Sequence, residues 1–203
     1  MKNSRKKTLA ILALIIFIVI GVKVKASQEG ILFDERIMDY IHGKATLLGI
    51  DIMRKVTYFG SVYFFLPIGL IIFFYMLRKR DTIGVFLLIL STLGSYGLNY
   101  ILKNIFIRTR PLKYFLIEQG GYSFPSGHAM VSMTFYTTMT YLLIRKINKK
   151  ETKVLLKSIN FLTIVLIGFS RIYLGVHWPT DVLMGYLIGY LFYIGMISLI
   201  PKE

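Results

Sequence analysis

The chain has 203 residues, of which 55% are hydrophobic and only 17% are charged, and its mean hydropathy is +0.63. Soluble domains carry about a quarter charged residues, so this composition excludes an ordinary soluble domain and predicts a membrane protein. The net charge of +15 does not indicate nucleic-acid binding, because the basic residues lie in short runs between apolar blocks, and the absence of cysteine excludes disulfides and thiolate metal sites.

Six apolar blocks each approach the ~20 residues that a helix needs to cross ~30 Å of hydrocarbon. Because a spanning segment must satisfy its own backbone hydrogen bonds in lipid, we predict an all-α polytopic bundle with six transmembrane helices. The predicted spans are Thr8–Val24, Gly60–Leu77, Thr82–Leu102, His128–Ile144, Val154–Phe169 and Asp181–Ile200. Together they are expected to form one membrane-embedded domain over residues 1–203.

The first apolar block follows a basic run at Lys2–Lys7, so a cleaved signal peptide is the alternative to a span. The tripeptide Lys25–Ser27 is a poor small-x-small cleavage site, because basic residues precede it. We therefore favour a retained first span.

The segment between the first two blocks, Ile31–Tyr58, has apolar residues spaced among charged ones. This spacing predicts one or two short amphipathic helices at the outer membrane interface. A simple solvated loop is the alternative.

Loop charge predicts the orientation of the bundle. With both termini in the cytoplasm, the inner segments hold 14 Lys and Arg against 3 Asp and Glu, whereas the outer segments hold 11 against 7. These inner segments are Met1–Lys7, Arg78–Asp81, Arg145–Lys153 with Lys157, and Pro201–Glu203. We expect a multi-pass protein of the cell membrane.

Three polar clusters fall in the outer loops of this topology, although none of them was used to derive it. They are Lys103–Pro111 after the third predicted span, Phe124–His128 before the fourth, and Ser170–Asp181 between the fifth and sixth. Their shared side of the membrane predicts a single extracytoplasmic site.

The basic residues of these clusters suit a phosphate group. Lys103, Arg110 and Arg171 would repel one another unless an anion joined them, and guanidinium forks match phosphate oxygens. Ser126 and Gly127 precede a predicted helix, so backbone N–H groups at its start can point at the same anion.

His177 and Asp181 are four residues apart, and Pro179 suits the first position of the last helix. A carboxylate in that first turn can accept a hydrogen bond from one ring nitrogen of His177 and leave the other free to attack. His128 arrives from another loop and can protonate a leaving oxygen.

The three clusters resemble the tripartite signature of the type 2 phosphatidic acid phosphatase family, which is similar in its core to the vanadium haloperoxidases. The matching residues are Lys103-x6-Arg110-Pro111, Pro125-Ser126-Gly127-His128 and Ser170-Arg171-x5-His177-x3-Asp181. Three motifs in order are far more specific than any one alone. The small chain without extra domains resembles bacterial members.

The resemblance implies metal-independent dephosphorylation of a lipid phosphate or diphosphate through a phosphohistidine, with no cofactor. His177 is then the nucleophile, Asp181 its partner and His128 the general acid. The phosphate-binding residues would be Lys103, Arg110, Arg171, Ser126, Gly127 and Ser170, the last by a phosphate-side or structural hydrogen bond. Clustered acidic residues suited to Mg²⁺ are also absent from the sequence.

The family includes enzymes for phosphatidylglycerophosphate, phosphatidate and undecaprenyl diphosphate, and the motifs do not choose among these lipids. The expected partners are the lipid substrate and membrane lipids, without nucleic acid or an obligate protein partner. A transporter or channel for an anionic substrate is the alternative function, but it predicts ionisable residues at mid-membrane. A soluble haloperoxidase conflicts with six spans.

Several residues have simpler interpretations. Arg108 and Lys113 are expected to be snorkelling anchors at a span end. Trp178 suits an aromatic belt or a wall of the site beside His177. Gly185-x3-Gly189 indicates close helix packing within the bundle, with a dimerisation face as the alternative.

Overall fold

A computed structural model of the chain describes residues 2–27 and 30–200, and within these ranges it contains helices and no strand. Met1 and Pro201–Glu203, which the predicted topology places in the cytoplasm, lie outside the described residues. The helices are α1 (Lys2–Ser27), α2 (Leu32–His42), α3 (Leu47–Tyr58), α4 (Val62–Arg78), α5 (Thr82–Ile89), η1 (Leu90–Gly94), α6 (Ser95–Phe106), η2 (Leu112–Tyr114), α7 (Gly127–Ile144), α8 (Lys150–Tyr173) and α9 (Pro179–Ser198). The predicted all-α class is confirmed.

Five helical stretches among the described residues are long and apolar enough to cross a membrane. They are Lys7–Ser27, Leu47–Arg78, Thr82–Phe106, Lys150–Tyr173 and Pro179–Ser198. The fourth predicted span coincides with α7, which is less apolar because it contains one serine and four threonines. The chain is a multi-pass membrane protein, whereas the number of six spans stays a prediction.

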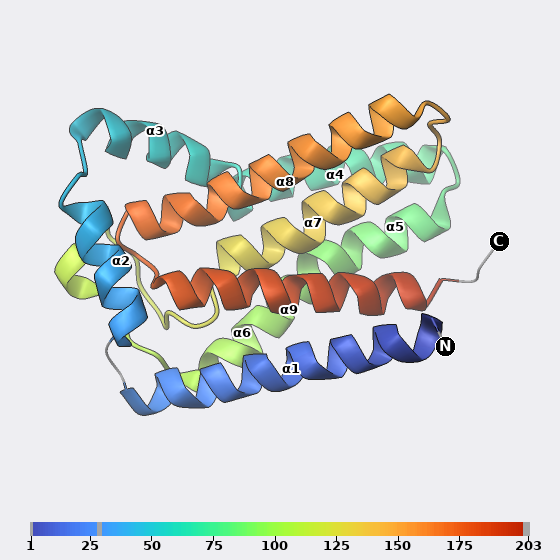
Figure 1. Cartoon of the computed structure of the whole chain (residues 1–203). Helices are drawn as coiled ribbons and strands as arrows, with labels where there is room; N and C mark the ends of the chain where they lie inside the picture. Colours follow the sequence, from blue (N-terminus) through green and yellow to red (C-terminus); the bar gives the residue numbers. More distant parts are fainter. Residues whose placement is uncertain (1, 28–29, 201–203) are drawn as a thin grey trace.

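Helix α7 lies at the centre of the bundle and packs mainly against α8 and α9 (Figure 1). Two glycines of α9 allow a close approach to α7, as the Gly185-x3-Gly189 spacing predicts. A Cβ atom at Gly185 would lie 2.8 Å from Ser126 O, and one at Gly189 would lie 2.7 Å from Met130 O. Within this chain, the small-residue face is therefore used to pack α9 on α7.

Helix α1 is part of the same core. Phe17 is 2% exposed, and its ring lies 5.7 Å from that of Phe106 on α6 and 5.4 Å from that of Phe124 before α7. The first predicted span thus packs directly against the segment that leads into α7.

The predicted amphipathic segment forms two helices, α2 and α3, which lie at the end of the bundle opposite the start of α1 (Figure 1). Helix α3 packs on α8, and α2 packs on both α8 and α9. Thr46 caps α3 by accepting a 3.1 Å hydrogen bond from Gly49 N. Its own N–H donates to the hydroxyl of Tyr173 on α8 at 3.0 Å.

Four helix termini meet at this same end of the bundle: the ends of α6 and α8 and the starts of α7 and α9 (Figure 1). The long connection from α6 to α7 starts at Ile107, whose φ of 51° ends the helix. The connection from α8 to α9 is short and turns at Gly175. All three sequence clusters lie on these termini and connections.

Candidate active site

Gly175 shapes the turn that brings His177 into the site. Its φ is +74°, a conformation that glycine adopts without strain. A Cβ atom there would lie 1.7 Å from the carbonyl oxygen of Tyr114, so the α6–α7 connection packs directly on this turn. The turn leaves the His177 side chain almost fully buried.

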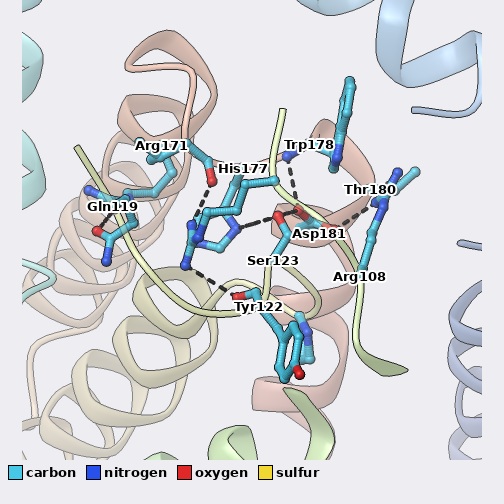
Figure 2. Close-up of polar contacts among 12 residues, drawn as sticks. Arg108, Gln119, Tyr122, Ser123, Arg171, His177, Trp178, Thr180 and Asp181 are labelled. Carbon is cyan, nitrogen blue, oxygen red and sulfur yellow. Dashed lines mark hydrogen bonds and ion pairs between the residues drawn. The ribbon is translucent and has the colours of Figure 1, made fainter. Parts of the chain in front are cut away.

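Asp181 lies in the first turn of α9, with Pro179 as the first helical residue, as predicted. Its Oδ2 accepts a 2.9 Å hydrogen bond from the backbone N–H of Trp178 and lies 3.4 Å from His177 Nδ1 (Figure 2). The carboxylate therefore caps the N-terminus of α9 and also faces the His177 ring.

Ser123 also contacts this pair, and the sequence analysis missed it. Its hydroxyl donates to Asp181 Oδ2 and lies 3.3 Å from His177 Nδ1 (Figure 2). Its backbone N–H donates a 2.8 Å hydrogen bond to the carbonyl oxygen of Arg108. A serine in an irregular loop carries no periodic signal, although its place just before the second motif was a hint.

The second ring nitrogen of His177 faces the cationic side of the site. Arg110 Nη1 lies 3.3 Å from His177 Nε2. A guanidinium can only donate, so Nε2 acts as the acceptor and Nδ1 carries the hydrogen that faces Asp181. Burial lowers the pKa of His177 well below its ordinary value, and the positive charges of Arg110, Lys103 and Arg171 lower it further. The imidazole is therefore neutral with a lone pair on Nε2.

Arg110 is held in place by backbone carbonyls. Its Nη1 donates to Val176 O at 2.6 Å, while its Nε donates to Gly121 O at 2.8 Å and Gly120 O at 3.1 Å. Burial lowers the pKa of Arg110 to about 10, so the side chain stays charged at neutral pH. Neutral carbonyls fix its orientation without cancelling its charge.

Lys103 and Arg171 complete the cationic cluster that the motifs predict. Lys103 Nζ donates to the carbonyls of Tyr122 and Ser123, and Arg171 interacts electrostatically with both Lys103 and Arg110. Arg171 itself donates to Thr57 Oγ1 and Gln119 Oε1, each at 2.7 Å. Figure 2 shows the contact with Gln119. Three cations thus gather beside His177 Nε2.

Two of the predicted phosphate-binding residues each have a buried polar atom with no hydrogen-bond partner among the described residues. They are Arg171 Nε and Ser126 Oγ. Buried polar groups are normally paired, so each of these two atoms calls for a partner that the described residues do not supply. An anion with several oxygens would fit this set of donors.

The remaining predicted residues lie at the start of α7 and the end of α8. His128 is in the first turn of α7 and interacts electrostatically with Arg171 and His177. Gly127 packs against Asn99, since a Cβ atom there would lie 2.9 Å from Asn99 Oδ1. The Ser170 hydroxyl donates to Ile167 O within α8, which is a structural hydrogen bond; a contact from Ser170 to phosphate stays a prediction.

The anchor interpretation of Arg108 is wrong. Its side chain is fully buried, with Nη2 2.6 Å from Asp34 Oδ2 and Nη1 2.7 Å from Asp181 Oδ1. Lys113, by contrast, is 74% exposed. Trp178 is 6% exposed and its Nε1 donates to Thr109 O, so it is buried and not part of a surface belt, whereas a wall of the site beside His177 stays a prediction.

Comparison with known proteins agrees with the three motifs. The model of the PAP2 superfamily matches residues 84–203. Phosphatidylglycerophosphatase B of Bacillus subtilis is 35% identical over 144 residues, which cover 70% of this chain and 71% of that protein. An undecaprenyl-diphosphatase of Sulfolobus acidocaldarius is 29% identical over 187 residues, covering 87% and 84%.

The fold is also similar to a solved structure. The crystal structure of a transmembrane PAP2-type phosphatidylglycerolphosphate phosphatase from Bacillus subtilis superposes with a TM-score of 0.82 at 28% identity. The match covers 93% of this chain and 94% of that one. By its family match, its motifs and its fold, this chain belongs to the PAP2 superfamily.

Proposed function

We propose that the chain removes phosphate from a membrane lipid phosphate or diphosphate through a phosphohistidine at His177. The observation that carries this proposal is that groups of opposite charge face the two nitrogens of the neutral imidazole. Its Nδ1 faces the Asp181 carboxylate at 3.4 Å, while its Nε2 faces the cationic cluster through Arg110 at 3.3 Å. A phosphate held by that cluster would lie against the nitrogen that bears the lone pair.

In the first step, the Nε2 lone pair of His177 forms a bond to phosphorus as the bond to the lipid oxygen breaks. His128 donates a proton to that leaving oxygen, and Asp181 stabilises the positive charge that develops on the imidazole. In the second step, water attacks phosphorus and gives a proton to His128. The N–P bond breaks, which releases phosphate and restores neutral His177.

The cations supply the electrostatic part of catalysis. Phosphoryl transfer depends mainly on in-line positioning and on neutralising charge at the phosphate oxygens. Lys103, Arg110 and Arg171 meet that charge, and the backbone N–H groups at the start of α7 add further donors. Turnover should therefore need no added divalent metal and no organic cofactor.

The lipid nature of the substrate is inferred from two observations. The proposed site lies at the ends of membrane-length helices, which supports a substrate whose headgroup lies at the membrane surface. The relatives are named for phosphatidylglycerophosphate and undecaprenyl diphosphate, and phosphatidate is the third candidate. A transporter would place its charges at mid-membrane, whereas the cations here lie at helix ends.

The distribution of loop charge supports a site on the extracytoplasmic side of the cell membrane, with both termini in the cytoplasm. The chain has no cysteine, so single cysteines can report sidedness. In intact cells, a membrane-impermeant maleimide should label Leu112→Cys, which is 71% exposed near the site, but not Lys146→Cys at the opposite end. The reverse pattern would place the site inside.

The catalytic test is phosphate release by detergent-purified protein from the three candidate lipids in mixed micelles. Activity should persist in EDTA and be inhibited by vanadate, a phosphate mimic. His177→Ala should abolish turnover, whereas His42→Ala, at the only histidine outside the motifs, should not. Activity of His177→Ala, or loss of activity in EDTA with rescue by Mg²⁺, would contradict the mechanism.

The acid role of His128 has its own test. His128→Ala should lose much more activity with a poor alkyl leaving group than with a good aryl one, because only the poor leaving group needs protonation. Equal losses of activity with both substrates would contradict the general-acid role of His128.

A further inference from the structure

Asp34 lies on α2, outside the three motifs, yet it reaches the centre of the site. Its side chain and that of Arg108 are both 0% exposed, and they are 2.6 Å apart across 74 positions of sequence. Removing two charges from water is costly, and a buried pair adds little net stability. Such a pair at this place calls for a role other than holding the fold together.

Asp34 is fixed on the first turn of α9. Its Oδ1 accepts a 2.9 Å hydrogen bond from Thr180 N, and its Oδ2 accepts a 2.8 Å bond from the Thr180 hydroxyl. The first N–H groups of a helix have no hydrogen-bond partner within the helix, and a carboxylate beside them is favoured by the helix dipole. Asp34 therefore ties α2 to the turn that contains Asp181.

Arg108 connects Asp34 to the other side of that turn. Its Nη1 donates to both Thr180 Oγ1 and Asp181 Oδ1, each at 2.7 Å (Figure 2). A guanidinium is planar, so two bonds from one end and an ion pair at the other fix its orientation.

The two oxygens of Asp181 are thus held from different sides. Oδ1 accepts from Arg108, while Oδ2 faces Ser123, Trp178 N and His177 Nδ1. Without the bond at Oδ1, the carboxylate could rotate about its terminal torsion, which is soft in aspartate. Rotation would move Oδ2 away from the imidazole.

We propose that Asp34 and Arg108 are positioning residues that fix the Asp181 carboxylate against His177. This inference rests on the proposed function of His177 and Asp181. Asp34 orients Arg108, Arg108 holds Oδ1 of Asp181, and Oδ2 then keeps the His177 ring in the tautomer that attacks. Neither residue touches the phosphate, because both lie on the Asp181 side of the ring and the cationic cluster lies on the other.

The test is the kinetics of Asp34→Asn, in which one carboxylate oxygen becomes an NH2 group that cannot accept, so that the bond from either Arg108 or Thr180 N is lost. We expect kcat per vanadate-binding site to fall about 10- to 100-fold, the scale on which a reacting group loses efficiency when it is misplaced by ~1 Å. KM and the vanadate affinity should change by less than about 2-fold, since the phosphate side is untouched. Loss of vanadate affinity with kcat retained would overturn the proposal.

The matched control is Asp39→Asn on the same helix. Asp39 also pairs with a basic residue of the α6–α7 connection, Lys113, at 3.1 Å, but both side chains are largely exposed. An exposed pair of this kind contributes little, so kcat should stay at the wild-type value. Equal losses from both variants would show that any change in α2 matters, and would overturn the specific role of Asp34.

A double-mutant cycle separates positioning from folding. In an Asp181→Asn background, Asp34→Asn should change kcat by less than about 2-fold, because its effect passes through Asp181. If the two losses multiply, Asp34 acts independently and the proposal fails. An active His177→Ala variant would instead refute the proposed function itself.

Thr180→Val provides a milder variant if Asp34→Asn does not fold. It removes the hydroxyl between Asp34 and Arg108 but keeps the backbone N–H bond to Asp34. A smaller drop in kcat with unchanged vanadate affinity is expected, and Thr180→Ser should restore it. A wild-type kcat in a folded Thr180→Val protein would count against the network.

Discussion

Gly175 offers a sharp test of how the turn before His177 is built. Its φ of +74° lies in the left-handed region, and a Cβ atom there would lie 1.7 Å from Tyr114 O and 2.4 Å from Tyr114 C. These are backbone atoms and cannot rotate away. The two segments are also joined by a 3.1 Å hydrogen bond from Leu116 N to Leu174 O, so neither moves without losing a contact.

The magnitude of Gly175→Ala follows from two contributions. A left-handed conformation costs a non-glycine residue about 1–2 kcal/mol. Forcing a methyl group into filled space adds about 1–3 kcal/mol. We therefore expect Gly175→Ala to lower the free energy of unfolding by about 2–5 kcal/mol and to displace His177 enough to abolish phosphate release.

Gly121 is the matched control. Its φ of +73° is nearly the same, but no described atom lies within 4 Å of a Cβ built there. Gly121→Ala should therefore show only the backbone contribution, about 1–2 kcal/mol. Its carbonyl would still accept from Arg110 Nε, so activity should largely persist.

The assay is unfolding of both variants in detergent, followed by phosphate release at a temperature where each is folded. The difference between the two variants isolates the contact with Tyr114. Equal destabilisation by both substitutions, or a fully active Gly175→Ala protein, would refute the claim that this contact sets the position of His177.

Two other predictions concern titration and the first helix. Burial, and then the charges of Arg110, Lys103 and Arg171, lower the pKa of His177. NMR of labelled histidine should therefore show a neutral His177 ring as the pH falls through 6.5, and Arg110→Gln should raise the pKa of His177. A wild-type ring that protonates near pH 6.5 would contradict this explanation. Phe17→Ala should lower the free energy of unfolding by about 3 kcal/mol. Ile16→Ala, at a neighbouring residue that is 51% exposed, should have little effect, and similar losses from both would argue against a core role for α1.

The helices could be predicted because they are encoded locally, and the site residues are proposed on an equally local basis, the spacing of the motifs. A long apolar block needs a helix wherever it lies, and Pro179 with Asp181 marks the start of α9 within three residues. The motif spacing likewise predicts which cations gather beside His177, without knowledge of the tertiary fold. Helix α7 is predicted as well, but its polar residues, of which Ser132, Thr134 and Thr138 are buried, make its hydropathy a weaker guide to its place in the membrane.

The Asp34–Arg108 pair could not be predicted, because the two residues are far apart in the sequence and meet only in the folded chain. Arg108 follows a predicted span, where a basic residue is usually a snorkelling anchor. Asp34 lies on an amphipathic helix, where a charge usually faces solvent. The two meet because α2 and the α6–α7 connection both contact the first turn of α9, and neither residue's local pattern shows that both are fully buried.

The structure also shows why so many charges can share one small site. His177 separates them by sign: the Asp181 and Asp34 carboxylates lie on its Nδ1 side, and the cationic cluster lies on its Nε2 side. Arg108 bridges the two carboxylates and limits their mutual repulsion, while carbonyl oxygens orient Arg110 without neutralising it. The field across the ring therefore favours a hydrogen on Nδ1 and a lone pair on Nε2, which is the state that the proposed attack on a bound phosphate requires.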